Sequence, residues 1–232
     1  MKPYERLAEA IAPDGTVLTL YRHDGSYQLR VNGVELMTTR RVNSEVQLAE
    51  VACAPLVTIA GVQVLIGGLG FGFTMQAALD VLGGDARVVV AEIVGEVIEW
   101  NRNPEYGLSH AALADPRVEL RHADVLEVLR DNPGAYDAIM LDVDNGAESL
   151  VTSGNTQLYN DTGILTTLAA LRAGGSIVYW SAQDDPRFVR SLQRAGMKVE
   201  TRRIRPHPTV GGYYSLFIAR RKQSAKSRRG GH

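Results

Sequence analysis

Four acidic residues follow segments that we expect to be strands: Glu92, Asp124, and the pair Asp142 and Asp144. Because the carboxyl ends of parallel strands meet at one edge of a sheet, we expect these side chains to share a crevice. Carboxylates placed together can accept hydrogen bonds from hydroxyl and amine groups, hold a cation, or take up a proton. Their positions predict a site for a polar, positively charged ligand.

A glycine cluster precedes the first of these acids. The apolar run 62–66 leads into four glycines, and a segment with helical period follows: Gly67, Gly68, Gly70 and Gly72. Glycine lets the backbone approach a ligand closely, and the free N–H groups of a helix start point at it. A ligand-free strand-to-helix turn has the same pattern. Glu92 follows at about the 20-residue spacing of an acid that accepts ribose hydroxyls, although it could also serve the next helix start.

The other acids have two interpretations each. Asp124 can accept a hydrogen bond from an adenine amine, or cap a helix that begins at Val125. Alternation puts Asp142 and Asp144 on one side of the chain, where two close carboxylates can provide a general base or hold a cationic substrate. The same stretch can also be a simple Asp-rich turn. Tyr159 follows a long connection, 145–158, that we interpret as a substrate lid.

The elements that must position these residues alternate between strand and helix from Leu56 onward. The pattern predicts a mostly parallel sheet with helices on both faces. We expect parallel strands at 62–66, 87–91, 117–121, 137–141 and 175–180, and a helix over 159–171. Two final strands, 197–205 and 213–220, follow each other directly and predict one antiparallel edge.

Residues 1–55 have a different character. We expect a short helix within 1–12 and an antiparallel meander of strands 16–21, 26–31 and 34–38, with a hairpin turn at Asn32-Gly33. A helix from about Ser44 to Cys53 should lead into the first parallel strand. The predicted domains are therefore an extension at 1–55, a catalytic domain at 56–221, and a disordered basic tail at 222–232.

Composition narrows the function classes. The 232 residues have a net charge of −1, so the body carries no nucleic-acid footprint, although the last 13 residues hold six Lys or Arg and no acid. The single cysteine, Cys53, excludes a disulfide framework, and the five histidines lack metal-ligand spacing, so no metal is expected. No apolar run reaches about 18 residues and no leader opens the chain, so we expect a cytoplasmic protein without membrane contact.

The run from Tyr27 to Arg221 resembles the spermidine synthase family, aminopropyltransferases built on the class I methyltransferase fold. The matching pieces are Val31-Asn-Gly-Val-Glu-Leu-Met-Thr, Ile66-Gly-Gly-Leu-Gly-Phe-Gly, Ala91-Glu-Ile, Val97-Ile-Glu, Asp115-Pro-Arg-Val-Glu-Leu, Ala123-Asp and Tyr136-Asp-Ala-Ile-Met-Leu-Asp. The resemblance implies a Rossmann-like α/β fold with a mostly parallel seven-stranded sheet, an antiparallel last strand, and a preceding antiparallel β meander that supports a homodimer. It also implies that Glu92 binds ribose, Asp124 binds adenine, and Asp142 accepts the proton of an attacking amine.

Three departures from the family pattern bear on the substrates. Gly70 stands where the family's glycine loop usually has Asp, and Asp144 moves the second carboxylate of the family's Asp-x-x-Asp. The family's Tyr-His-Glu is not legible before the first strand, where Gln47 and Glu50 are the residues that could substitute for it in substrate binding. In the family these groups help to handle the polyamine and the cofactor's free amine.

The loop change suggests a choice of cofactor. S-adenosylmethionine carries a carboxylate that its decarboxylated form lacks, and Gly70 removes a like charge while leaving backbone N–H donors. We therefore expect methyl transfer from S-adenosylmethionine to a small, amine-containing acceptor. The alternatives are aminopropyl transfer from decarboxylated S-adenosylmethionine to a polyamine and a non-catalytic binding or scaffold protein. A nicotinamide-dependent oxidoreductase is disfavoured by the strand-pair ending and by the pattern of acids.

Overall fold

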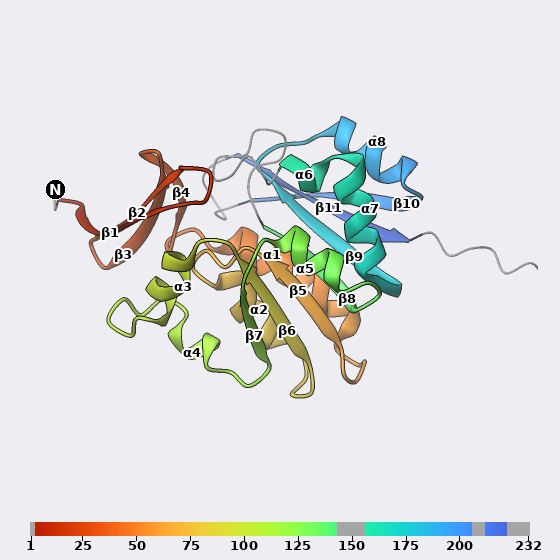
Figure 1. The fold of residues 1–232 in the computed structure, drawn as a ribbon, viewed down its shortest axis with the longest axis horizontal. Coiled ribbons are helices and arrows are strands. Elements are labelled where there is room, and N and C mark those ends of the chain that lie inside the picture. Colours follow the sequence, from red (N-terminus) through yellow and green to blue (C-terminus); the bar gives the residue numbers. More distant parts are fainter. Residues whose placement is uncertain (1–2, 143–155, 206–211, 222–232) are drawn as a thin grey trace, which may run out of the picture.

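The computed structural model describes residues 3–142, 156–205 and 212–221, and its first four strands form a separate antiparallel sheet (Figure 1). Their order is β1-β2-β3-β4, with the bounds Glu5–Ile11, Val17–His23, Ser26–Val31 and Val34–Thr38. The Asn32-Gly33 hairpin is confirmed, because both residues have the positive φ angles, 48° and 84°, of a tight two-residue turn. The helix expected within 1–12 is wrong: β1 pairs with β2, the next strand in the chain, and this hairpin pairing outweighs local helix propensity.

The second sheet has seven strands in the order β10-β11-β9-β8-β5-β6-β7. Their bounds are β5 Gln63–Gly67, β6 Arg87–Glu92, β7 Val118–His122, β8 Tyr136–Leu141, β9 Leu171–Ser181, β10 Met197–Ile204 and β11 Tyr214–Arg221. The strands β5 to β9 are parallel to their neighbours, whereas β11 is antiparallel to both β9 and β10. The predicted fold, a mostly parallel seven-stranded sheet with an antiparallel last strand, is confirmed.

Helices cover both faces of this sheet (Figure 1). Their bounds are α1 Asn43–Cys53, the 3₁₀ helix Ala54–Leu56, α2 Phe73–Val81, α3 Gly95–Arg102, α4 His110–Leu113, α5 Val125–Asp131, α6 Thr156–Tyr159, α7 Asp161–Ala170 and α8 Pro186–Arg194. The helix expected over 159–171 is observed as α7, which starts at Asp161 because the Asn160 side chain accepts the Gly163 N–H and caps it; the short helix α6 ends just before this cap. The short helix α4 was not expected.

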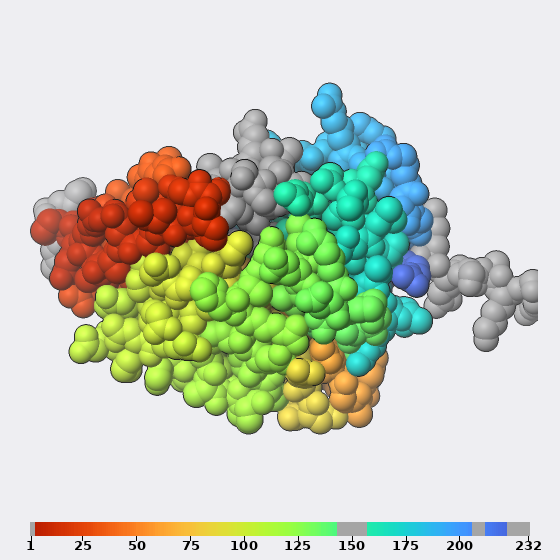
Figure 2. Space-filling view, in the orientation of Figure 1, coloured from red at the N-terminus to blue at the C-terminus, as the bar shows by residue number. Residues whose placement is uncertain are grey.

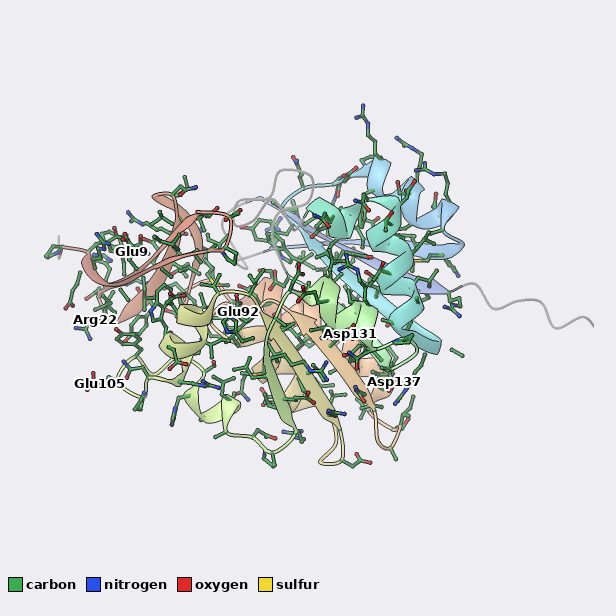
Figure 3. All side chains as sticks on the ribbon, viewed as in Figure 1. Glu9, Arg22, Glu92, Glu105, Asp131 and Asp137 are labelled. Carbon is green, nitrogen blue, oxygen red and sulfur yellow. The ribbon has the colours of Figure 1, made fainter. Side chains whose placement is uncertain are left out.

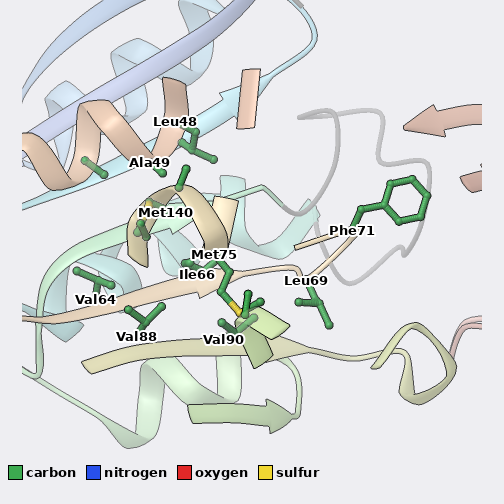
Figure 4. Packing of buried hydrophobic residues seen from close by; sticks show 14 of the residues in the cluster. Leu48, Ala49, Val64, Ile66, Leu69, Phe71, Met75, Val88, Val90 and Met140 are labelled. Carbon is green, nitrogen blue, oxygen red and sulfur yellow. The ribbon is translucent and has the colours of Figure 1, made fainter. Parts of the chain in front are cut away.

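The central strands β5, β6 and β8 consist largely of apolar residues because both of their faces are buried. Val64 and Ile66 belong to the core cluster that includes residues of α1 and α2, while Leu65 belongs to the cluster under α5 and α7. Figure 4 shows Val88 and Val90 of the neighbouring strand alongside this first cluster. The alternation follows from the period of two in a strand, and it fixes which of the two helix layers each side chain packs against.

The N-terminal sheet lies against the large domain rather than standing free. Its side chains Leu18, Leu20 and Leu29 are buried in the same core cluster as α1 and α3. In Figure 2 the red surface of this sheet meets the yellow surface around α3. None of the helices within the described ranges combines the length and apolarity that crossing a bilayer requires. The predicted tail 222–232 lies outside the described residues.

Candidate functional site

The predicted acids lie at one edge of the large sheet. Gly67 and Glu92 end the neighbouring strands β5 and β6, and Asp142 directly follows β8 on the other side of β5. Asp124 follows β7, which pairs with β6 at Glu92. The four residues come from separate parts of the chain, and the parallel pairing brings them together as the sequence predicts. Asp144 lies outside the described residues.

The glycine loop needs its glycines. Gly68, Gly70 and Gly72 have φ angles of 88°, 52° and 80°, a region in which other residues are strained. A Cβ atom on Gly72 would lie 2.4 Å from Cβ of Ser109, and one on Gly70 would lie 2.8 Å from Cε of Met37. The loop is therefore both conformationally strained for other residues and enclosed by side chains.

Glu92 is buried and turns toward this loop. One of its carboxylate oxygens accepts the Leu69 N–H at 2.9 Å, and the other accepts the Val94 N–H at 2.8 Å. Burial raises the pKa of Glu92, against the opposing effect of these backbone donors. Figure 3 shows Glu92 between the N-terminal sheet and the large sheet. The backbone N–H groups of Ile93 and Gly70 also favour the ionised carboxylate, and Glu92 lines the cavity described below, so its contact with ribose hydroxyls stays a prediction.

The backbone N–H groups of the loop are mostly engaged inside the protein. Gly68 donates to the Ala91 carbonyl oxygen at 2.8 Å, and Gly72 donates to the Leu69 carbonyl oxygen at 2.7 Å. The backbone N–H groups of Leu69 and Gly70 both form hydrogen bonds with the Glu92 carboxylate. The sequence argument for S-adenosylmethionine required free donors around Gly70 to meet the cofactor's carboxylate. Four of the loop donors already have protein partners, so this part of the argument is not supported.

Asp124 and Asp142 are each fixed by local hydrogen bonds. Asp124 Oδ1 accepts the Leu126 N–H at 2.8 Å and caps α5, so the capping interpretation is confirmed, and the adenine contact stays a prediction. Asp142 donates its backbone N–H to the Gly67 carbonyl oxygen at 3.2 Å, and its Oδ2 accepts the Thr74 hydroxyl at 3.4 Å. Both carboxylates are thus held in place at the edge of one cavity.

This cavity encloses about 920 Å³, including space open to solvent. Its floor is the strand ends and the glycine loop, and its roof is the N-terminal sheet and α1. The lining residues are Leu18, Leu29, Leu36, Met37, Glu45, Gly68, Gly70, Ala91, Glu92, Ile93, Val94, Val97, Ala123, Asp124, Val125, Asp142 and Trp180.

The charged side chains that line the cavity are all acidic among the described residues. Among the described residues, four carboxylates line the cavity and no Lys, Arg or His does: Glu45, Glu92, Asp124 and Asp142. Burial raises the pKa of Glu45, whose side chain is held by the Ser44 hydroxyl at 2.5 Å. In the described ranges no group of three or more His, Cys, Asp or Glu is arranged to hold a metal ion. The cavity is therefore complementary to an organic cation.

Three predicted substrate residues do not line this cavity. Glu50 is exposed and Gln47 is half-buried on α1, while Tyr159 packs against the rings of Tyr179 and Phe188. The residue that sequence reasoning missed on α1 is Glu45.

The apolar pattern of α1 contained a signal for Glu45. The buried residues Leu48, Ala49 and Ala52 recur at helical spacing, and Glu45 precedes the first two by three and four positions. It therefore lies on the inward face of the helix, whereas Glu50 does not.

Comparisons with known proteins bear on the fold. No protein-family model matches the sequence, and no curated protein matches it. A solved spermidine synthase in complex with the transition state analogue AdoDATO superposes with a TM-score of 0.70 at 19% identity, over 94% of this chain and 72% of that one. The spermidine synthase from Thermotoga maritima superposes with a TM-score of 0.69 at 18% sequence identity, over 94% of this chain and 73% of that one. A probable spermidine synthase from Corynebacterium glutamicum ATCC 13032 superposes with a TM-score of 0.65 at 16% sequence identity, over 97% of this chain and 81% of that one. The chain thus has a spermidine synthase-like fold, as the sequence resemblance implied.

Proposed function

We propose that this protein is a transferase that moves the aminopropyl group of decarboxylated S-adenosylmethionine to an amine acceptor. The observation that carries the proposal is the set of four carboxylates, unaccompanied by any basic side chain among the described residues that line the cavity. The decarboxylated donor has two positive charges, the sulfonium and the ammonium, and an amine acceptor brings more. Burying such charges is favourable only where carboxylates receive them.

Each side chain has a role that follows from its place. Glu92, at the end of β6, accepts the ribose hydroxyls while its other lone pairs hold the glycine loop. Asp124 follows the end of β7 and lines the cavity, where it can accept a hydrogen bond from the adenine amine. Asp142, between the donor side and the acceptor side, takes up a proton from the attacking amine. The amine nitrogen then forms a bond to the carbon beside the sulfonium, the carbon–sulfur bond breaks, and methylthioadenosine leaves.

Methyl transfer from S-adenosylmethionine, our first expectation, has less support. The cofactor's carboxylate would enter a cavity that already holds four carboxylates, and the loop N–H groups that were expected to receive it have protein partners. Like charges placed together without a counter-ion are unfavourable. The solved structures with this fold are also named as spermidine synthases, which favours the aminopropyl reaction.

The products separate the two reactions. Purified protein is incubated with 1,4-diaminobutane and either decarboxylated S-adenosylmethionine or S-adenosylmethionine, and the nucleoside products are identified by mass spectrometry. Aminopropyl transfer gives methylthioadenosine, and methyl transfer gives S-adenosylhomocysteine. The proposal predicts turnover with the decarboxylated donor alone. Accumulation of S-adenosylhomocysteine would overturn it, as would the absence of both products over a panel of amines.

A matched pair of variants tests the role of Asp142. Asp142→Asn removes the proton acceptor and should lower kcat by about 10²- to 10⁴-fold, the usual contribution of general base catalysis. Asp131→Asn is the control, because Asp131 is exposed at the end of α5 and does not line the cavity. Equal activity of the two variants would remove Asp142 from the mechanism.

A further inference from the structure

Met37 occupies the space that a side chain at position 70 would need. Met37 belongs to β4 of the N-terminal sheet and lines the cavity beside the glycine loop. A Cβ atom built on Gly70 would lie 2.8 Å from its Cε and 3.0 Å from its Sδ. An acid at this position of the loop would need the flexible end of the Met37 side chain to move aside. A side chain from the N-terminal sheet has replaced a loop side chain at this point of the cavity.

This replacement leaves the donor's tail ammonium without its carboxylate partner on the loop. A buried ammonium needs a carboxylate, and three of the four that line the cavity have other tasks. Glu92 binds the loop N–H groups, Asp124 caps α5, and Asp142 lies where the attacking amine must be deprotonated. Among the described lining residues, Glu45 is the acid that remains.

The position of Glu45 suits this task. It lies in the first turn of α1, close in sequence to Met37, and α1 packs against α2, β8 and β9. The helix α2 begins directly after the glycine loop, and β8 leads into Asp142. Glu45 thus lines the cavity from the roof, together with the glycine loop and Asp142. Its burial, at 8% exposure, means that an arriving ammonium meets little competition from water.

We propose that Glu45 binds the ammonium of the donor's aminopropyl tail, and that Met37 takes the place of the loop side chain which would otherwise do so. This assignment rests on the proposed aminopropyl transfer. It means that the N-terminal sheet and α1 recognise the aminopropyl tail of the donor. The interaction is a charge-assisted hydrogen bond at a buried site.

The first test compares two ligands that differ in the tail. Decarboxylated S-adenosylmethionine carries the aminopropyl group, and methylthioadenosine does not. Calorimetric titration of Glu45→Gln should show about 10- to 100-fold weaker binding of the decarboxylated donor and less than about twofold change for methylthioadenosine. Glu50→Gln, the same change at an exposed site on the same helix, should alter neither. Methylthioadenosine binding also reports that the variant is folded.

The outcomes distinguish this inference from the proposed function. If the wild type binds the decarboxylated donor no better than S-adenosylmethionine, the proposed function fails. If it prefers the decarboxylated donor but Glu45→Gln weakens both ligands equally, or changes only the KM of the amine acceptor, this inference alone is overturned.

A second pair of variants tests the place of Met37. In the Glu45→Gln background, Met37→Ala with Gly70→Asp restores a loop acid, and Asp tolerates the left-handed backbone of this position. Binding of the decarboxylated donor should recover by about tenfold. Met37→Lys in an otherwise wild-type chain should shift the preference toward S-adenosylmethionine, whose carboxylate the lysine would pair. Equal effects of Met37→Lys on both donors would overturn the assignment without requiring any Glu45 variant to fold.

Discussion

Asn101 should hold the glycine loop in its binding conformation. Its buried amide donates to the Gly70 carbonyl oxygen and to the Val97 carbonyl oxygen, both at 2.8 Å, and its Oδ1 accepts the Ser109 hydroxyl at 2.7 Å. Asn101→Ala leaves two groups without a partner, the buried Ser109 hydroxyl and the partly buried Gly70 carbonyl. At about 1–3 kcal/mol for a buried unpaired group, the free energy of unfolding should fall by about 2–3 kcal/mol. For a chain of this size that lowers Tm by about 5–10 °C.

The assay is urea unfolding at equilibrium with a double-mutant cycle. Because Ser109→Ala breaks the same hydrogen bond from the other side, the double variant should cost about 1–2 kcal/mol less than the sum of the single variants. Asn132→Ala is the control, since the Asn132 amide makes the same contact with a carbonyl four residues earlier but no second bond, and it should cost about 0.5 kcal/mol or less. Additivity within about 0.5 kcal/mol, or a loss of under about 1 kcal/mol for Asn101→Ala, would refute the reasoning.

Three further predictions concern stability and pH. Gly72→Ala should lower the free energy of unfolding by at least about 2 kcal/mol, through strain at its positive φ and the clash with Ser109, whereas Gly84→Ala, with open space around it, should cost far less; equal costs in urea unfolding would contradict this. Hydrogen bonds from Arg117 lower the pKa of Asp115 from 3.8 to about 2, so Asp115 stabilises the fold above pH 3.8 and loses this effect as the pH falls toward 2. The Tm difference between the wild type and Asp115→Asn should therefore shrink over that range. A constant Tm difference would refute this prediction. Burial raises the pKa of Glu45 above 4.5, so the unfolded chain loses this proton first, and the stability of the wild type declines as pH rises through that value. Glu45→Gln lacks this decline, so its Tm should rise relative to that of the wild type between pH 4 and 8. Parallel Tm curves for the two proteins would count against the burial argument.

Local patterns in the sequence were enough to predict the floor of the cavity. The strand, glycine loop and helix at 62–82 follow one another directly, and parallel pairing then fixes where Glu92, Asp124 and Asp142 must lie. These residues depend only on short-range signals and on a sheet rule that holds for most α/β folds.

The roof of the cavity could not be predicted in the same way. Met37 contacts Gly70 because the N-terminal sheet folds back over the loop, and no periodicity within either segment encodes that contact. The strand β1 was not predicted for a different reason: it forms a hairpin with β2, the next strand in the chain, and this pairing outweighs the helix propensity of the segment. Glu45 is an intermediate case: the buried face of α1 indicated its direction, but the cavity that it enters is built from distant parts of the chain.

The most direct test of the site is the ratio of its affinities for the two candidate donors. The dissociation constants of decarboxylated S-adenosylmethionine and S-adenosylmethionine are measured by calorimetry on the wild-type protein at neutral pH and low salt. A cavity lined by four carboxylates predicts that the decarboxylated donor binds at least about tenfold more tightly, because the extra carboxylate of the other ligand meets no basic side chain among the described lining residues. Equal or tighter binding of S-adenosylmethionine would contradict the account and return methyl transfer to first place.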